Sequence, residues 1–242
     1  MKLNCDLGES DHNCSIGIDE QAMALIDLAN IACGFHASNP DIMAKTIRSA
    51  IQHNVTIGAH PGYNDKQGFG RRSLSHSSTQ ITHLVAYQTG ALQALCQCHG
   101  ARVEYIKPHG ALYNDMMVDC NIFTAILQAA VACMDQPKLM ILAQPSNDLY
   151  QQLAQKYNVK LLFEAFADRA YTSQGTLTNR SIPGSVFVNE IQIIKQVQQL
   201  RLTGSVTSFD GTILQLNADT ICVHGDNAAS IAVLKQLHDE LK

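Results

Sequence analysis

The chain has 242 residues, of which 46% are hydrophobic and 16% are charged. α/β barrels of this length are commonly one domain, so we expect a single domain over residues 1–242. The net charge is −4, and the sequence contains no stripe of basic residues. Both observations argue against nucleic acid or an anionic membrane surface as a partner. The sequence shows neither a signal-peptide core nor an apolar run near the ~20 residues of a membrane span, so we expect a cytoplasmic protein.

The eight cysteines do not indicate a metal ribbon or a redox pair. No Cys-x-x-Cys spacing occurs, and six of the cysteines fall within apparent strands or helical patterns. In such positions a free cysteine behaves as a small hydrophobic residue.

Seven short apolar segments predict buried strands, and each is followed by a helical or loop pattern. The predicted strands cover residues 3–7, 30–35, 55–60, 103–106, 139–143, 159–166 and 220–223. The predicted helices cover residues 19–28, a segment from 40, 77–98, 119–134, 147–157, 191–200 and a C-terminal segment after 226. Local signals support two of the helix starts, with Asn39-Pro40 as a cap followed by a first-turn proline, and Ser77 with Gln80 as a capping box. Asp210-Gly211 between β-prone residues predicts a small hairpin.

Chemically active side chains gather where the predicted strands end. Four of the ten histidines follow strands directly, namely His36, His60, His109 and His224. The other such residues are Asp6, Lys107, Glu164 and Asp168. Because the loops at the carboxyl ends of barrel strands converge on one site, this distribution favours a (β/α) barrel with one shared pocket. A doubly wound open sheet is the alternative, but it would gather residues only from the strands beside its switch point.

Seven segments together resemble the LamB/YcsF family, and the resemblance spans almost the whole chain. They are Leu3-Asn4-Cys5-Asp6-Leu7-Gly8-Glu9, Asn30-Ile31-Ala32-Cys33-Gly34-Phe35-His36, Gly58-Ala59-His60-Pro61-Gly62, Gly68-Phe69-Gly70-Arg71-Arg72, Lys107-Pro108-His109-Gly110-Ala111-Leu112-Tyr113, Glu164-Ala165-Phe166-Ala167-Asp168-Arg169 and Val223-His224-Gly225-Asp226. One departure is visible: the family typically has an aspartate where this chain has Asn39. Asn can replace Asp as a helix cap, but a carboxylate role at this position is excluded.

The resemblance implies a single (β/α) barrel, expected to be seven-stranded and related to the glycoside hydrolase/deacetylase group. It also implies the ATP-dependent opening of 5-oxoproline to L-glutamate by a complex in which this chain has two partners, subunits B and C. ATP would then be a cofactor, bound at a site that the partners complete. No Gly-x-x-x-x-Gly-Lys-Ser/Thr loop occurs in the chain, so a phosphate cradle must come from elsewhere or be of another kind, built on residues 68–72.

Opening a five-membered lactam requires an activated water, stabilisation of charge on the carbonyl oxygen and a proton for the leaving nitrogen. Imidazoles suit the proton transfers, a buried carboxylate can orient them or act as base, and guanidinium groups suit a carboxylate or phosphate. The candidate catalytic residues are Asp6, His60, Lys107, His109, Glu164 and His224. The candidate substrate-binding residues are Asn4, Asn30, His36, Arg72, Asp168 and Arg169. For either arginine the alternative is a structural ion pair across the barrel mouth.

Two other functions remain open at this stage. Asp6, His36 and His60 together would suit a divalent metal in an amide hydrolase or deacetylase, but no His-x-x-x-His pair supports this, and the idea rests on analogy between folds. Alternatively, the chain is a non-catalytic component that binds the small molecule while a partner performs the chemistry. The sequence does not separate these possibilities.

Overall fold

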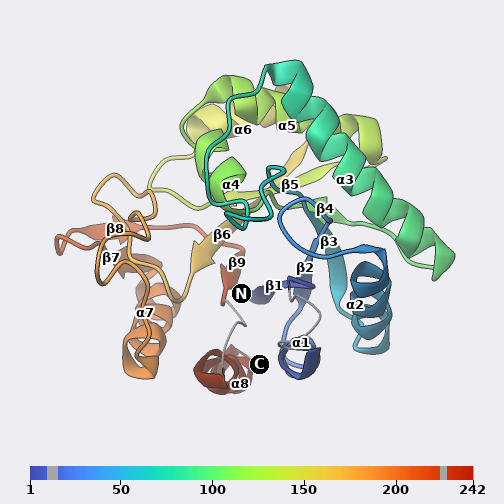
Figure 1. The fold of residues 1–242 in the computed structure, drawn as a ribbon. Coiled ribbons are helices and arrows are strands. Elements are labelled where there is room, and N and C mark those ends of the chain that lie inside the picture. The colour runs from blue at the N-terminus through green and yellow to red at the C-terminus, as the bar shows by residue number, and fades with distance from the viewer. Residues whose placement is uncertain (10–15, 224–227, 242) are drawn as a thin grey trace.

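A computed structural model describes residues 1–9, 16–223 and 228–241. Among these residues, seven parallel strands form a closed barrel (Figure 1). In barrel order they are β1 (Lys2–Leu7), β2 (Leu28–Ala32), β3 (Thr56–His60), β4 (Tyr105–Ile106), β5 (Lys138–Leu142), β6 (Lys160–Phe166) and β9 (Thr220–Cys222). Strand β9 closes the barrel because it pairs with both β6 and β1. The predicted seven-stranded (β/α) barrel is thus confirmed, and the open sheet is excluded.

Helices surround the barrel in Figure 1. Their bounds are α1 (Ile16–Met23), α2 (Pro40–Gln52), α3 (Ser78–Cys98), α4 (Gly110–Met116), α5 (Cys120–Cys133), α6 (Asp148–Lys156), α7 (Glu190–Thr203) and α8 (Ala228–Leu241). Apolar strand residues such as Ile31, Ile57 and Ile141 are almost wholly buried, as expected for parallel strands covered by helices. No single helix in the described part of the chain is long and apolar enough to cross a membrane.

Local capping signals in the sequence match the structure. The side chain of Asn39 accepts hydrogen bonds from the backbone N–H groups of Asp41 and Ile42, and so begins α2. Ser77 and Gln80 form both bonds of a capping box at the start of α3. The predicted hairpin is also present, as β7 (Ser205–Thr207) and β8 (Ile213–Gln215).

Several element boundaries differ from the prediction, and strand pairing explains the earlier end of α1. Helix α1 ends at Met23 because Leu28 belongs to β2, where it pairs with Asn4 on one side and Thr56 on the other. The same strand ends at Ala32, after which Gly34 turns the chain with a φ of 97°. Strand β4 begins at residue 105 rather than 103. The short helix α4 was not predicted.

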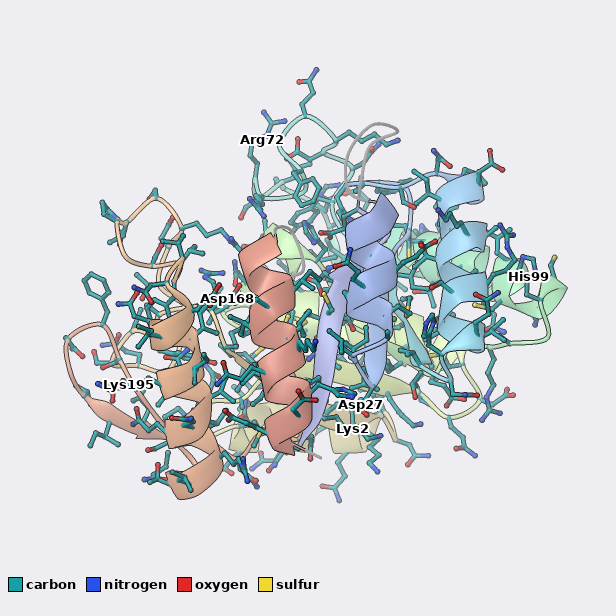
Figure 2. All side chains as sticks on the ribbon, turned by 90° about the horizontal axis from the view of Figure 1, so that it is seen from below. Lys2, Asp27, Arg72, His99, Asp168 and Lys195 are labelled. Atoms are coloured by element: carbon teal, nitrogen blue, oxygen red, sulfur yellow. The ribbon has the colours of Figure 1, made fainter. Side chains whose placement is uncertain are left out.

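Because the barrel strands are parallel, their carboxyl ends meet at one end of the barrel, which we call the mouth. We call the opposite end the base. Figure 2 shows Arg72 on a loop at the mouth end, with Lys2 and Asp27 at the base. Predicted functional residues that follow a described strand, such as Lys107 and His109, therefore lie toward the mouth.

Candidate functional site

A cavity of about 450 Å³ opens at the mouth. This volume falls within the range of about 300–1,000 Å³ that is usual for small-molecule sites. Residues from several βα connections line it, including Asp6, Glu9, His60, Arg71, Lys107, His109, Tyr113, Phe166, Arg169, Thr178 and Arg180. Loops widely separated in the sequence thus form one pocket, as the sequence predicted.

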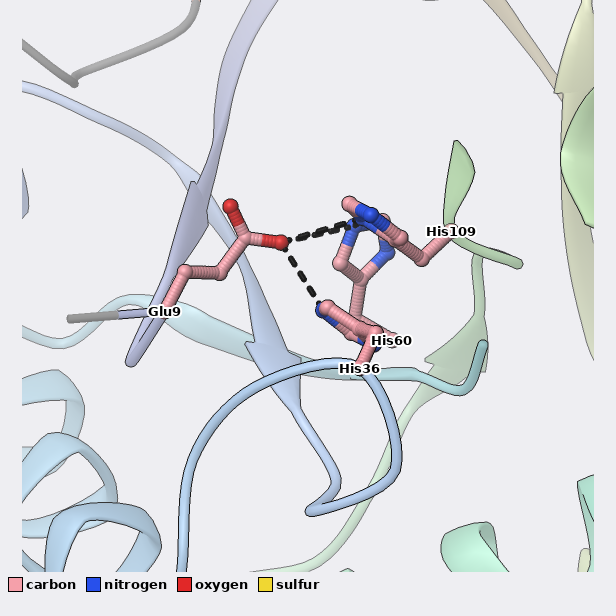
Figure 3. A group of neighbouring side chains, drawn as sticks. All are labelled: Glu9, His36, His60 and His109. Carbon is pink, nitrogen blue, oxygen red and sulfur yellow. Dashed lines mark hydrogen bonds and ion pairs between the residues drawn. The ribbon is translucent and has the colours of Figure 1, made fainter. Parts of the chain in front are cut away.

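Four neighbouring residues at the mouth, Glu9, His36, His60 and His109, form what we call the mouth cluster (Figure 3). Glu9, His60 and His109 line the cavity, whereas His36 is not among its described lining residues. Glu9 Oε1 lies 2.9 Å from His36 Nε2 and 3.0 Å from His109 Nδ1, and 3.6 Å from His60 Nε2. His60 Nε2 and His109 Nδ1 are 2.9 Å apart. All three histidines are buried. The cluster therefore directs one carboxylate oxygen and three ring nitrogens toward a common point.

Two glycines allow the histidine rings to pack this closely. The rings of His36 and His109 stack in parallel with centroids 3.7 Å apart. A Cβ atom on Gly62 would lie 2.8 Å from His36 Nδ1, and one on Gly70 would lie 2.8 Å from His36 Cβ and 2.9 Å from His109 Cδ2. Any side chain at either glycine would therefore displace the stacked pair. The loop after β3 needs these glycines for this packing.

Beside the mouth cluster lies a second group, the lysine network, made of Asp6, Lys107 and Glu164. Lys107 Nζ is 2.8 Å from Asp6 Oδ1 and 2.8 Å from Glu164 Oε1. The hydroxyl of Tyr113 donates to Glu164 Oε2 at 3.0 Å. Burial alone would lower the pKa of Lys107, but the negative charges of Asp6 and Glu164 raise it well above its ordinary value. The network thus holds a permanent cation at the cavity floor.

Asn4 and Asn30, which the sequence suggested as substrate-binding residues, lie inside the barrel. Both are fully buried, and neither lines the described part of the cavity. Asn30 Nδ2 donates to Asn4 Oδ1 and to Asp6 Oδ1, at 2.8 Å in each case. The hydroxyl of Tyr105 donates to Asn30 Oδ1 at 2.6 Å. These contacts from inside the barrel orient the carboxylate of Asp6.

Arginines line the other side of the cavity. Arg169 is buried, and its Nη2 donates to the Thr178 carbonyl at 2.7 Å. Burial and the nearby charge of Arg180 lower the pKa of Arg169 to about 10, so it remains charged at neutral pH. Arg71 lines the cavity from the loop after β3.

Arg72 and Asp168 are placed differently. The side chain of Arg72 is 62% exposed and forms an ion pair with Asp65. Arg72 is not among the described cavity residues, and its ion pair lies within its own loop rather than across the barrel mouth. Asp168 is buried next to Arg169 but does not line the described cavity. His224 lies outside the described residues.

Electrostatics distinguish the members of the mouth cluster. Burial raises the pKa of Glu9, but hydrogen bonds from His109 and His36 and the charge of His109 outweigh it and hold that pKa far below its usual value. Burial, together with the charge of His109, lowers the pKa of His36 to about 3. At neutral pH the cluster therefore contains an ionised Glu9 and a neutral His36.

Glu9 received no role from the sequence pattern, although it lies two residues beyond β1 in the segment from Asn4 to Glu9 that carries the family resemblance. Its position after a strand end is the same signal that identified the histidines. Tyr113 was also missed, since it belongs to helix α4, which was not predicted. Arg71 lies in the segment 68–72 that the sequence suggested for a phosphate, whereas Arg180 received no role of its own.

The mouth cluster has a composition that is compatible with a divalent metal, because its four candidate ligand atoms all lie within 4.8 Å of one another. The sequence had suggested Asp6 with His36 and His60. The structure instead gathers Glu9 and His109 with those two histidines, and holds Asp6 Oδ1 against Lys107.

Comparison with known proteins identifies similar chains over the full length. The sequence model of the LamB/YcsF family matches residues 1–242. The chain is 49% identical to the 5-oxoprolinase A subunit of Vibrio cholerae O395 over 241 residues, covering 100% of this chain and 97% of that protein. Identity to the proteins of the same name is 52% in Vibrio parahaemolyticus and 48% in Pseudomonas fluorescens Pf-5, with 95% and 96% of those proteins covered.

A solved structure is also similar to this chain over nearly its full length. The lactam utilization protein from Thermus thermophilus superposes with a TM-score of 0.88 at 34% sequence identity, covering 99% of this chain and 96% of that one. The barrel and its helices are therefore shared with a protein that belongs to lactam utilization by name.

Proposed function

This chain belongs to the LamB/YcsF family, and from that premise we propose that it is the A subunit of an ATP-dependent 5-oxoprolinase. The complex hydrolyses the lactam of 5-oxoproline to L-glutamate, and subunits B and C are its partners. The observation that carries this proposal is the 49% identity to a 5-oxoprolinase A subunit over 100% of this chain. The mouth cavity, with its buried charges, is the place where we assign the chemistry.

The cavity holds groups for each requirement of lactam opening. The cation of Lys107 stabilises negative charge that develops on the amide oxygen. Arg169, which remains charged, holds the carboxylate of 5-oxoproline through its planar guanidinium group. The carboxylate of Asp6, which lines the cavity and whose Oδ2 lies 3.3 Å from His60 Nε2, is placed to take a proton from water and to pass it to the leaving nitrogen.

When bound, ATP would supply activation, because transfer of its γ-phosphoryl group to the amide oxygen, with release of ADP, would make the carbonyl carbon more electrophilic. Arg71 and Arg180 also line the cavity, and their guanidinium groups suit a phosphoryl group. Since no P-loop occurs in the sequence, partner subunits complete the nucleotide site over the mouth. A pocket enclosed in this way also protects the activated intermediate from water.

The test is reconstitution. The purified chain is mixed with 5-oxoproline, ATP and Mg²⁺, with and without subunits B and C from a relative, while glutamate and phosphate are measured. We expect glutamate only when all three subunits and ATP are present. Rapid glutamate formation by the lone chain would contradict the proposal, and so would full activity of the partners without this chain.

A second candidate, an ATP-independent metal hydrolase, is favoured by the mouth cluster alone. It predicts glutamate from the lone chain after metal is added, without ATP. The third possibility, a component that only binds the substrate, predicts that Lys107→Met in the assembled complex raises KM and leaves kcat unchanged. Lys138→Met at the base is the matched control, because it removes a lysine that lies outside the mouth cavity.

A further inference from the structure

Backbone carbonyls determine which ring nitrogens of His60 and His109 carry a proton. His60 Nδ1 lies 2.7 Å from the carbonyl oxygen of Lys107, and His109 Nε2 lies 2.8 Å from that of Phe69. Since a carbonyl oxygen only accepts, each of these nitrogens must donate a hydrogen. In the neutral form of each ring, the other nitrogen therefore presents a lone pair.

These two lone pairs face each other and an ionised carboxylate. His60 Nε2 and His109 Nδ1 are 2.9 Å apart, and Glu9 Oε1 is 3.0 Å from His109 Nδ1 and 3.6 Å from His60 Nε2. Three acceptors so close together in a buried site repel one another unless a positive charge lies among them. That charge is either an additional proton or a metal ion.

The spacing of the three atoms suits a metal ion. Ligand atoms that are each about 2.0–2.1 Å from a zinc ion lie roughly 2.9–3.5 Å from one another in tetrahedral or octahedral arrangements. The three measured separations, 2.9, 3.0 and 3.6 Å, lie close to this range. His36 Nε2, at 2.9 Å from Glu9 Oε1, is positioned as a fourth ligand atom.

We propose that the mouth cluster is a binding site for one first-row divalent transition metal ion such as Zn²⁺. Imidazole nitrogens favour such ions, whereas Mg²⁺ and Ca²⁺ prefer sites made only of oxygen. The carbonyls of Lys107 and Phe69 act as the outer partners that orient ligating histidines in metal sites. A metal here would supply Lewis acidity at the edge of the cavity that contains Lys107.

Asp6 is assigned outside this ligand set. Its Oδ2 lies 3.3 Å from His60 Nε2, but its Oδ1 is held by Lys107 and Asn30. The proposal thus makes a distinction that can be tested: Glu9→Gln removes a ligand charge, whereas Asp6→Asn leaves the ligand set complete. His83, an exposed residue of α3, provides a histidine control away from the mouth.

Metal binding is measured on the purified chain alone, so the result does not depend on turnover or on the proposed function. The chain is treated with a chelator, dialysed and titrated with Zn²⁺ by calorimetry and with Co²⁺ by visible absorption. We expect one ion per chain, with d–d bands for bound Co²⁺. Loss of an outer partner alone typically weakens a metal site by about 10–100-fold, so Glu9→Gln and His109→Ala should each weaken binding by at least about 100-fold.

The controls give opposite expectations. His83→Ala should bind Zn²⁺ as the unaltered chain does, and Asp6→Asn should stay within about 10-fold of it, since any effect passes through outer contacts. Circular dichroism and thermal melting verify that each variant is folded, and Glu9→Gln is the variant of least volume change. Failure of the folded chain to bind either ion, or equal binding by Glu9→Gln, would overturn the proposal and leave a shared proton as the occupant.

Discussion

The two ends of the barrel both carry a cavity with charged walls, but they differ in how those charges are solvated. The base cavity is the larger, at about 740 Å³ against about 450 Å³ at the mouth. Its ion pair between Lys138 and Glu104 leaves both side chains more than a quarter exposed, whereas the Lys107 side chain at the mouth is only 3% exposed. Burial of charge, rather than cavity size, therefore marks the functional end.

The largest difference between the ends should appear in activity. In the assembled complex we expect His60→Ala or His109→Ala to reduce turnover by at least about 100-fold, because each removes a member of the mouth cluster and loss of an outer partner alone typically costs about 10–100-fold. Lys160→Ala at the base should leave turnover nearly unchanged. The measurement is glutamate formation, accompanied by thermal unfolding of each variant. If both histidine variants keep full activity, or if neither folds, the site assignment is wrong.

The next difference concerns stability and uses a matched pair of lysines. Lys107→Met leaves Asp6 and Glu164 buried without their cation, so we expect the free energy of unfolding to fall by about 3–5 kcal/mol. Lys138→Met breaks a partly exposed pair and should cost about 0–1 kcal/mol. Chemical denaturation of both variants tests this. Equal losses would mean that the two networks are solvated alike.

Truncation of buried apolar residues in or next to the barrel strands should lower stability at either end of the barrel, whatever their distance from the site. Ile106 and Val223 are almost fully buried, and truncating either to Ala should lower the free energy of unfolding by about 1–4 kcal/mol. The same range is expected for Val103. Denaturant titration measures the loss, and a change in Ile106→Ala below about 0.5 kcal/mol would contradict its assignment to a packed core.

Much of this contrast was predictable, because parallel strands place their carboxyl ends together. The positions of His60, Lys107 and His109 directly after strands were sufficient to bring them into one cavity. The family resemblance and the capping signals at Asn39 and Ser77 were likewise properties of short local segments. Local sequence signals thus predicted the fold and brought Asp6, His60, Lys107, His109 and Arg169 to the cavity lining.

What was missed depends on contacts between distant segments. Val103 has strand-like character, but its N–H donates to Gln93 of α3, so β4 starts two residues later. Arg71 and Arg72 are neighbours in the same loop, but only Arg71 lines the cavity, because Arg72 forms an ion pair with Asp65. Glu9 was overlooked because only the folded loops bring it to the three histidines.

The last prediction is that the mouth and the base contribute differently to the pH dependence of the unfolding free energy. The pKa of His36 is lowered to about 3 by burial and by the charge of His109, so unfolding lets this residue take up a proton at any pH between about 3 and its unfolded value near 6.5. Its contribution to stability is therefore complete above pH 6.5 and decreases as the pH falls. At the base, the pKa of Glu104 is lowered by Arg102 and Lys138 despite partial burial, so its contribution decreases only below about pH 4.5.

Asp19 complicates a direct measurement because burial raises its pKa to about 6, which stabilises the fold as the pH falls below that value. The difference in unfolding free energy between the metal-free chain and its His36→Gln variant does not include the contribution of Asp19, since both proteins contain Asp19. At about 1.4 kcal/mol per pH unit below 6.5, the unfolding free energy relative to the variant should decrease by about 2 kcal/mol between pH 8 and pH 5. Urea denaturation across that pH range measures this change in unfolding free energy. Glu104→Gln is the control: because it retains His36, it should show the same decrease of about 2 kcal/mol relative to His36→Gln. A difference that stays constant with pH would mean that His36 is not held neutral, and that the mouth and the base respond to protons alike.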